Sequence, residues 1–304
     1  MELRHLRYFL AVGEALNFTK AAARLRVAQP ALSRQVQDLE DEIGVDLLRR
    51  SPRGVTLTAE GKLFLEEARE VLKRVDESVE KTRALARGQY GELHIGYIPI
   101  PTVEILPPAL EVFRKAAPHV RLVLHDLPTD ELISELRNAT LELAIMVQPL
   151  GEQTVGIEFE TLRTYVWGVA LSRAHPLARL KSIPLEELAG ESFVILSRKS
   201  YSEYHRILER IFAPIRTKPL IAMECDSEGS LFMEIEAGRG IALATTITKL
   251  ATGKRLVYRP LTGTTETQFV GIARATGGDV TPAGERFCEI LRKLSREIGK
   301  RVEQ

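Results

Sequence analysis

Residues 17–61 of this chain read NFTKAAARLRVAQPALSRQVQDLEDEIGVDLLRRSPRGVTLTAEG. Asn17 is a predicted N-cap for a short helix over 18–25, because an Asn side chain accepts hydrogen bonds from the free N–H groups of a first turn. Three consecutive alanines at 21–23 allow a second helix to approach closely. That second helix is predicted over 29–43, and a basic hairpin follows it. This order of elements suits the insertion of a helix into a groove of DNA.

The helix over 29–43 has two chemically different faces. Its apolar side chains fall within a narrow arc and form the predicted core face: Leu32, Val36, Leu39 and Ile43. The opposite face is polar, and Gln can pair with adenine, Arg with guanine, and Ser with a base or a phosphate. Proline is tolerated in the first turn of a helix. The predicted DNA-reading face consists of Gln29, Pro30, Ser33, Arg34 and Gln37.

The predicted hairpin over 49–58 carries three arginines, and a Pro-Arg-Gly turn separates its β-prone residues. Arg50 and Arg53 are further predicted DNA contacts. Arg53 at the tip is placed to enter a narrow minor groove, where the negative potential is enhanced. The alternative for each arginine is a plain phosphate contact or exposure to solvent. The chain's net charge is only +1, so the local pattern, and not bulk basicity, indicates nucleic acid.

Residues 59–86 are predicted to form one long helix that carries a narrow apolar seam. The spacing of the seam alternates between three and four residues, which is typical of a helix that pairs with another helix. We therefore predict dimerisation through this helix; the alternative is packing against its own domain. The predicted seam residues are Leu65, Ala68, Leu72, Val75 and Val79.

The remainder of the chain alternates short apolar strands with helices, which predicts open, mostly parallel sheets. Predicted strands cover 93–98, 120–126, 141–147, 193–196 and 241–244; predicted helices cover 102–116, 130–138, 202–212, 230–237 and 281–302.

Several classes of protein are disfavoured by the composition. No apolar run approaches the roughly 20 residues that span a bilayer, and the N-terminus lacks a secretory pattern, so we expect a cytoplasmic protein with no membrane partner. Cys225 and Cys288 are too few for a disulfide framework. The six histidines show no metal spacing, and neither a nucleophile elbow nor a P-loop occurs. We therefore predict no enzyme activity, no metal and no cofactor.

Residues 6–61, from LRYFLAVGEAL to TLTAEG, resemble the winged helix-turn-helix of LysR-type transcriptional regulators, and the resemblance extends over the whole chain. It implies an all-α winged helix-turn-helix DNA-binding domain over 1–58, a linker helix over 59–86 and a hinge over 87–91. It also implies an α/β, periplasmic-binding-protein-like effector domain over 92–304 with two Rossmann-like lobes. Lobe I would cover 92–162 and 267–304, and lobe II would cover 163–266.

The resemblance also implies partners: a dyad operator in double-stranded DNA, RNA polymerase, and further copies of the chain in a homotetramer built as a dimer of dimers. Ala28 departs from the family, which usually carries Ser at this position. A solute-binding protein of a transport system, or a DNA-binding protein without a ligand, are the alternative functions.

A small-molecule effector is expected between the lobes, and a small carboxylate or other anion is the predicted class. Helix starts that follow strands offer free N–H groups to such an anion. The alternative for the threonines is an ordinary N-cap, and for Arg198 it is exposure to water. The predicted effector contacts are Ile100, Pro101, Thr102, Thr129, Arg198, Ser202, Glu203, Tyr204 and Ser227.

Overall fold

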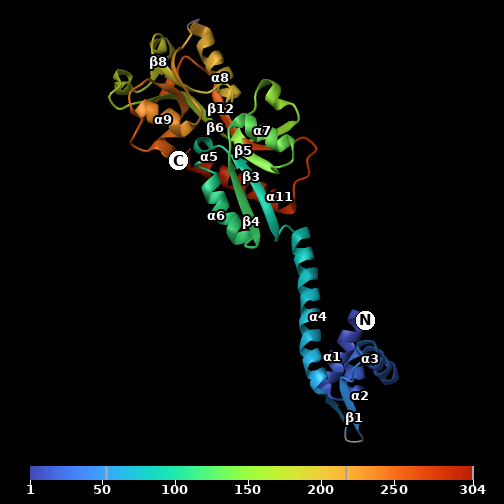
Figure 1. Cartoon of the computed structure of the whole chain (residues 1–304). Coiled ribbons are helices and arrows are strands. Elements are labelled where there is room, and N and C mark those ends of the chain that lie inside the picture. Colours follow the sequence, from blue (N-terminus) through green and yellow to red (C-terminus); the bar gives the residue numbers. More distant parts are fainter. Residues whose placement is uncertain (52–53, 216–217, 303–304) are drawn as a thin grey trace. The chain divides into compact units, whose positions relative to one another are not determined.

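The computed structural model describes residues 1–51, 54–215 and 218–302. The chain forms two compact units, residues 1–84 and 85–304 (Figure 1). In the described part of the chain no helix is both long enough and apolar enough to cross a membrane.

The first unit is a three-helix domain with a hairpin, followed by a long helix. Asn17 caps the second helix as predicted, since its Oδ1 accepts a hydrogen bond of 2.9 Å from the Lys20 N–H. The core is apolar and includes Phe9, Val12 and Leu32, which are fully buried. The elements of this unit are α1 Leu3–Ala15, α2 Phe18–Leu25, α3 Gln29–Ile43, β1 Leu48–Ser51, β2 Gly54–Leu57 and α4 Ala59–Ala86.

The start of α4 is fixed by a cap and by a close backbone contact. Thr58 accepts a hydrogen bond of 2.8 Å from the Gly61 N–H through its Oγ1. A Cβ atom on Gly61 would lie 1.9 Å from the carbonyl oxygen of Leu47, so only glycine fits between α4 and the hairpin.

The second unit is built on one eight-stranded mixed sheet and one two-stranded sheet. The large sheet has the order β4-β3-β5-β12-β6-β11-β7, with β10 also paired to β6, and β8 pairs with β9 in the small sheet. The strands are β3 Gly91–Tyr97, β4 Val120–Asp126, β5 Leu143–Val147, β6 Ile157–Leu171, β7 Ile183–Pro184, β8 Ser192–Leu196, β9 Leu220–Cys225, β10 Ala242–Thr245, β11 Val257–Thr262 and β12 Thr267–Ala275.

Helices surround these sheets and contribute to the cores (Figure 1). They are α5 Pro99–Thr102, α6 Leu106–Ala116, α7 Thr129–Arg137, α8 Ser202–Phe212, α9 Glu228–Glu236, α10 Thr248–Thr252 and α11 Pro282–Val302; short 3₁₀ turns cover Gly151–Thr154, Pro176–Arg179, Leu185–Leu188 and Ala213–Ile215.

Two predictions about this unit need correction. The expected helix over 102–116 is two helices, α5 and α6. The sheet is also less parallel than predicted: β3 pairs in parallel with β4 and β5, but β12 is antiparallel to both β5 and β6. The reason is that β6 and β12, two antiparallel strands that were not predicted, lie in the middle of the sheet. Charged side chains on β6 interrupt its apolar pattern, and two of them form ion pairs: Glu160 with Arg292 at 2.8 Å, and Arg163 with Glu104 at 3.2 Å.

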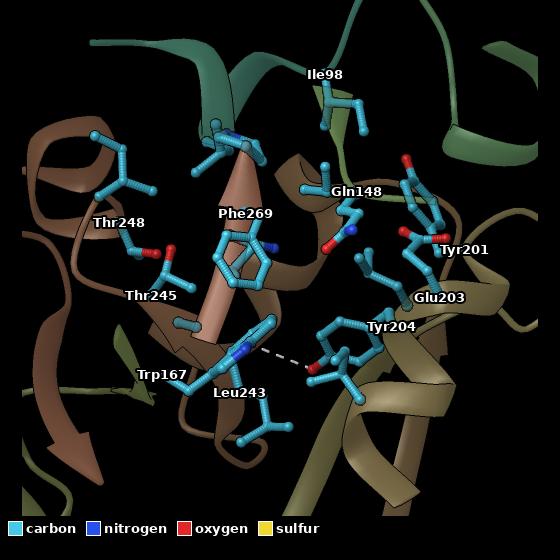
Figure 2. A pocket seen from close by; sticks show the side chains of 18 of the residues that line it. Ile98, Gln148, Trp167, Tyr201, Glu203, Tyr204, Leu243, Thr245, Thr248 and Phe269 are labelled. Atoms are coloured by element: carbon cyan, nitrogen blue, oxygen red, sulfur yellow. Dashed lines mark hydrogen bonds between the residues drawn. The ribbon is translucent and has the colours of Figure 1, made fainter. Parts of the chain in front are cut away.

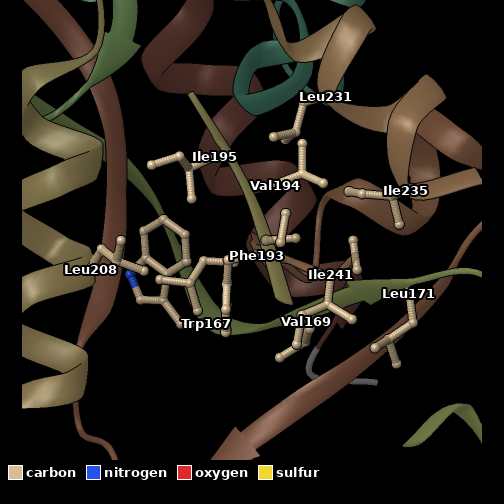
Figure 3. Close-up of a cluster of buried hydrophobic side chains, with 14 of the residues drawn as sticks. Trp167, Val169, Leu171, Phe193, Val194, Ile195, Leu208, Leu231, Ile235 and Ile241 are labelled. Atoms are coloured by element: carbon tan, nitrogen blue, oxygen red, sulfur yellow. The ribbon is translucent and has the colours of Figure 1, made fainter. Parts of the chain in front are cut away.

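Strand β6 divides the second unit into two cores. Its first part, up to Val166, pairs with β12, and its second part, from Trp167, pairs with β10 and β11. One core contains Leu93, Phe113 and Phe287. The other surrounds β8 and contains Trp167 and Phe193 (Figure 3). The strand runs without interruption through the predicted lobe boundary at 162/163, so the change of core falls a few residues later.

Candidate nucleic-acid interface and ligand cavity

Helix α3 presents its predicted polar face to solvent. Gln29, Pro30, Arg34 and Gln37 are exposed, and Ser33 is half-buried. The N-cap residue Ala28 makes no side-chain hydrogen bond to the first turn. Among the described residues, the first-turn N–H groups of α3 therefore lack a side-chain acceptor, and such groups can bind a phosphate.

The side chains on this face differ in whether they already form hydrogen bonds or ion pairs within the chain. Gln37 donates to Asp41 Oδ1 at 3.2 Å. Arg34 makes no hydrogen bond or ion pair with any residue that the structure describes, and its guanidinium is free to bind an external acceptor. Bidentate pairing of a free arginine with guanine is the commonest specific contact in the major groove.

Arg50 has a structural role that the sequence did not reveal. Its guanidinium donates to Ser33 Oγ and to Glu40 Oε2, both at 3.2 Å, and lies 5.2 Å from the centre of the Phe18 ring. Glu40 is only 4% exposed, and its Oε1 accepts hydrogen bonds of 2.8 Å from the N–H groups of Leu47 and Leu48. The Glu40 clamp, made of Glu40, Arg50 and these two N–H groups, therefore holds the hairpin against α3. Arg53, the predicted minor-groove contact, lies outside the described residues.

The predicted seam of α4 is only partly available to a partner. Leu65, Ala68 and Leu72 are buried within the first unit, Leu65 in the cluster of Phe9 and the other two with Leu6, both from α1. These three residues therefore pack against their own domain, which was the stated alternative, because an apolar stripe serves such packing as well as it serves pairing with a second helix. Their part in a dimer seam stays a prediction. Val75 is half-buried and Val79 is 42% exposed, so the seam is free only beyond Leu72.

A cavity of about 200 Å³ lies within the second unit, lined by residues from both cores (Figure 2). Four of the predicted effector contacts line it: Ile100, Pro101, Glu203 and Tyr204. Its other walls come from residues to which the sequence assigned no site. These additional lining residues include Ile98, Gln148, Tyr201, Trp167, Leu243, Thr245, Thr248 and Phe269.

The remaining predicted contacts do not line this cavity, which corrects the expectation that all nine meet at one ligand. Thr102 donates to the carbonyl oxygen of Ile98 at 2.6 Å. Thr129, fully buried, donates to Glu203 Oε1 at 2.8 Å. The other three are engaged elsewhere: Ser202 with Asp130, Arg198 with Glu209, and Ser227 as the N-cap of α9.

Two carboxyl groups occupy the place that was expected for an anion. Glu228 Oε2 accepts a hydrogen bond of 3.2 Å from the Ile100 N–H at the start of α5. Glu203 is 7% exposed and also contacts Gln153 Nε2 at 3.4 Å. Burial raises the pKa of Glu203 to about 7 and that of Glu228 to about 8. The helix start that was predicted to hold a ligand carboxylate is thus already bonded to a carboxyl group of the chain.

These two acids predict that the second unit loses stability as the pH rises. Unfolding returns both pKa values to about 4.3. The folded unit therefore binds more protons than the unfolded chain above that pH, and its free energy of unfolding falls until the pH passes about 8. The slope is about 1.4 kcal/mol per pH unit for each group. Urea denaturation from pH 5 to pH 9, followed by the fluorescence of Trp167, the single tryptophan, measures this.

Glu228→Gln should remove about half of this loss, because it leaves only Glu203 to titrate. Glu209→Gln, which replaces an exposed acid on α8, should follow the wild-type pH profile. A Glu228→Gln profile equal to the wild type would contradict the assignment.

Sequence reasoning missed Glu228 although it recognised the segment around it. The predicted helix began at Ser230, whereas α9 begins at Glu228, so the acid lies in the first turn. Trp167 and Phe269 were missed because β6 and β12 were not predicted. The signal for Glu228 was an acid next to a capping serine; only the fold shows that it meets Ile100, 128 residues earlier in the chain.

Two family models match the chain. The LysR substrate binding domain matches residues 86–296, and the bacterial regulatory helix-turn-helix protein, lysR family, matches residues 3–62. Among curated proteins, the HTH-type transcriptional regulator AlsR of Bacillus subtilis (strain 168) is 33% identical over 261 residues, covering 86% of each chain. The Hca operon transcriptional activator HcaR of Escherichia coli (strain K12) is 32% identical over 293 residues, covering 96% of this chain and 98% of HcaR.

Solved structures of regulators share the fold along nearly the whole chain. Full-length CbnR complexed with its target DNA matches with a TM-score of 0.81 and 28% identity, over 97% of this chain and 100% of CbnR. Full-length BenM matches with a TM-score of 0.56 and 30% identity, over 98% of this chain and 96% of BenM.

Proposed function

The chain belongs to the LysR family of DNA-binding transcriptional regulators with an effector-binding domain, and from this we propose that it reads a dyad operator in the cytoplasm as a homo-oligomer. The observation that carries the proposal is the exposed face of α3, where no described residue engages Arg34 and no described side chain accepts from the first-turn N–H groups. CbnR, which the chain resembles over its full length, has been solved with its target DNA.

A binding measurement on duplex DNA tests this proposal. The intergenic duplex next to the protein's own gene is labelled, and fluorescence anisotropy is followed at 50–200 mM salt. We expect submicromolar binding at 150 mM salt, with an affinity that falls steeply with salt because phosphate contacts release counterions. Equal affinity for an unrelated duplex of the same length would contradict a sequence-reading function.

We further propose that α4 pairs with α4 of a second copy, so that two winged units meet successive half-sites of the operator. The free apolar residues on this helix support the pairing. Val71, Val75 and Val79 are spaced four residues apart and share one face; Val71 is 45% exposed. A dimer of such dimers, acting on RNA polymerase at a promoter, is the assembly that we propose.

Val75→Glu should disrupt the α4 pairing, because it places a charge in the apolar face between two copies. We expect the dissociation constant of the assembly, measured by analytical ultracentrifugation, to rise at least tenfold. Lys73→Gln changes the charge by the same amount on the opposite side of α4 and should leave the assembly intact. A Val75→Glu protein that sediments like the wild type would contradict the proposed pairing of α4 with a second copy.

The cavity in the second unit is the proposed effector site. It is lined from both cores, so a ligand there would contact both lobes and favour one arrangement of them. Such a ligand can change DNA binding only as far as its affinity differs between the two arrangements.

A further inference from the structure

We propose that the effector of this cavity is an organic cation, an ammonium group carried on an apolar body of about one ring. The proposal rests on the proposed function, in which this cavity holds the effector. It departs from the small carboxylate expected from the sequence, and it follows from the charge, the walls and the size of the cavity.

The charge of the cavity favours a cation. Among the described residues that line it, Glu203, Glu228 and Glu266 are acidic and Arg210 alone is basic. Arg210 is exposed to solvent, whereas Glu203 is almost fully buried. The acids also feel further negative charge, since Asp126 acts on Glu228 and Asp130 acts on Glu203. A ligand carboxylate would add another negative charge to this group, and like charges in a buried site repel each other.

The hydrogen bonds at the start of α5 exclude an anion from the position where it was expected. Glu228 Oε2 already accepts from the Ile100 N–H. The contacts to Glu203 come from neutral donors, the Thr129 hydroxyl and the Gln153 amide, and no described cation pairs with either acid. Glu203 is almost fully buried and Glu228 is half-buried, and a carboxylate taken out of water is stable only when it is paired or protonated. An ammonium group between Glu203 and Glu228 would supply the missing partner.

The walls of the cavity suit the apolar part of such a ligand. Figure 2 shows the rings of Phe269, Trp167 and Tyr204 around one space, with Tyr201 and Glu203 on the side of α8. Aromatic faces attract cations within about 6 Å, so these rings and the two acids act in the same direction. The volume of about 200 Å³ also fits one ring with a short arm, since a cavity of about 150 Å³ already holds benzene.

Trp167 adds an independent indication that the cavity awaits a ligand. The residue is 3% exposed and lines the cavity, yet its Nε1–H has no hydrogen-bond partner among the described residues. Buried donors without a partner are rare in folded proteins and call for an explanation. A hydroxyl on the ligand's ring would accept from this group.

Matched compound series test the charge preference directly. Isothermal titration calorimetry on the full-length protein at pH 8 compares the amine, the alcohol and the carboxylate on three scaffolds. The first series is benzylamine, benzyl alcohol and benzoate. The second is phenethylamine, 2-phenylethanol and phenylacetate. The third is tyramine, tyrosol and 4-hydroxyphenylacetate. We expect the amine to bind at least tenfold more tightly than its two partners in at least one series. If the amine reaches this tenfold preference in none of the three series, whether because a carboxylate or an alcohol binds comparably or because no compound binds, the proposal is overturned.

Two further measurements test whether Glu203 and Glu228 cause the preference for the amine. Glu228→Gln keeps an acceptor for the Ile100 N–H but removes the charge, and it should reduce the amine preference at least tenfold. Glu209→Gln, on the exposed side of α8, should retain the preference. Amine affinity should also rise from pH 6 to pH 8, because Glu203 and Glu228 ionise in this window. Affinity that falls over this window would show that protonated acids bind the ligand and would overturn the proposal.

The same preparations are tested for binding to duplex DNA by anisotropy. If the wild-type protein shows no sequence-dependent DNA binding, the proposed function itself is contradicted. Intact DNA binding without an amine preference would overturn only the inference about the effector.

Discussion

Glu40→Ala is expected to lower the free energy of unfolding of the first unit by about 3 kcal/mol or more, because it removes the centre of the Glu40 clamp. The carboxylate is buried and accepts from the N–H groups of Leu47 and Leu48, and it pairs with Arg50. Alanine leaves two buried donors without an acceptor, and each such donor costs about 1–3 kcal/mol. Urea denaturation followed by far-UV circular dichroism measures the loss.

Asp38→Ala is the matched control for this variant. Asp38 lies on the same helix and is exposed, and among the described residues its side chain accepts only from Gln35. Its replacement should change the stability by less than about 0.5 kcal/mol. Glu40→Gln should fall between the two, since it keeps an acceptor but loses the charge. If Glu40→Ala and Asp38→Ala have equal stability, the hairpin is held by other contacts.

Arg34→Ala is expected to weaken binding to the operator by a factor of about 10 to 100, which corresponds to about 1–3 kcal/mol. Arg34 is exposed on α3 and is not engaged by any described residue, so its replacement should not disturb the fold. The operator should also lose its preference for guanine at one position in each half-site. Anisotropy titrations with duplexes that vary at each position measure both effects.

Arg114→Ala removes the same charge from α6 in the second unit and serves as the control. It should leave affinity and base preference unchanged. An Arg34→Ala protein that retains full affinity and the same base preference would contradict the recognition role of α3.

The elements of the first unit could be predicted from the sequence because their signals are local. The caps at Asn17 and Thr58 and the period of Leu32, Val36 and Leu39 lie within single helices. The partner of an apolar stripe is not a local property. Leu65, Ala68 and Leu72 have coiled-coil spacing, yet their own domain covers them.

The cavity was harder to predict for the same reason. Strand-to-helix junctions pointed to Ile100, Pro101, Glu203 and Tyr204, and these four residues do line the cavity. They did not show which polar side chain at each junction faces the cavity, and Thr102, Arg198 and Ser227 do not line it. The contact between Glu228 and Ile100 depends on how distant parts of the chain fold together, and this contact changes the expected charge of the ligand.

Selection of bound sequences from a random duplex library tests the central claim most directly. The claim is that paired copies of α3 read two half-sites of one operator. We predict that wild-type protein enriches an inverted repeat whose half-sites lie one helical turn, or a multiple of it, apart. The motif that the Arg34→Ala protein enriches should no longer specify one of the guanines in each half-site. Enrichment of no motif, or of a single unpaired half-site by the wild type, would contradict the account.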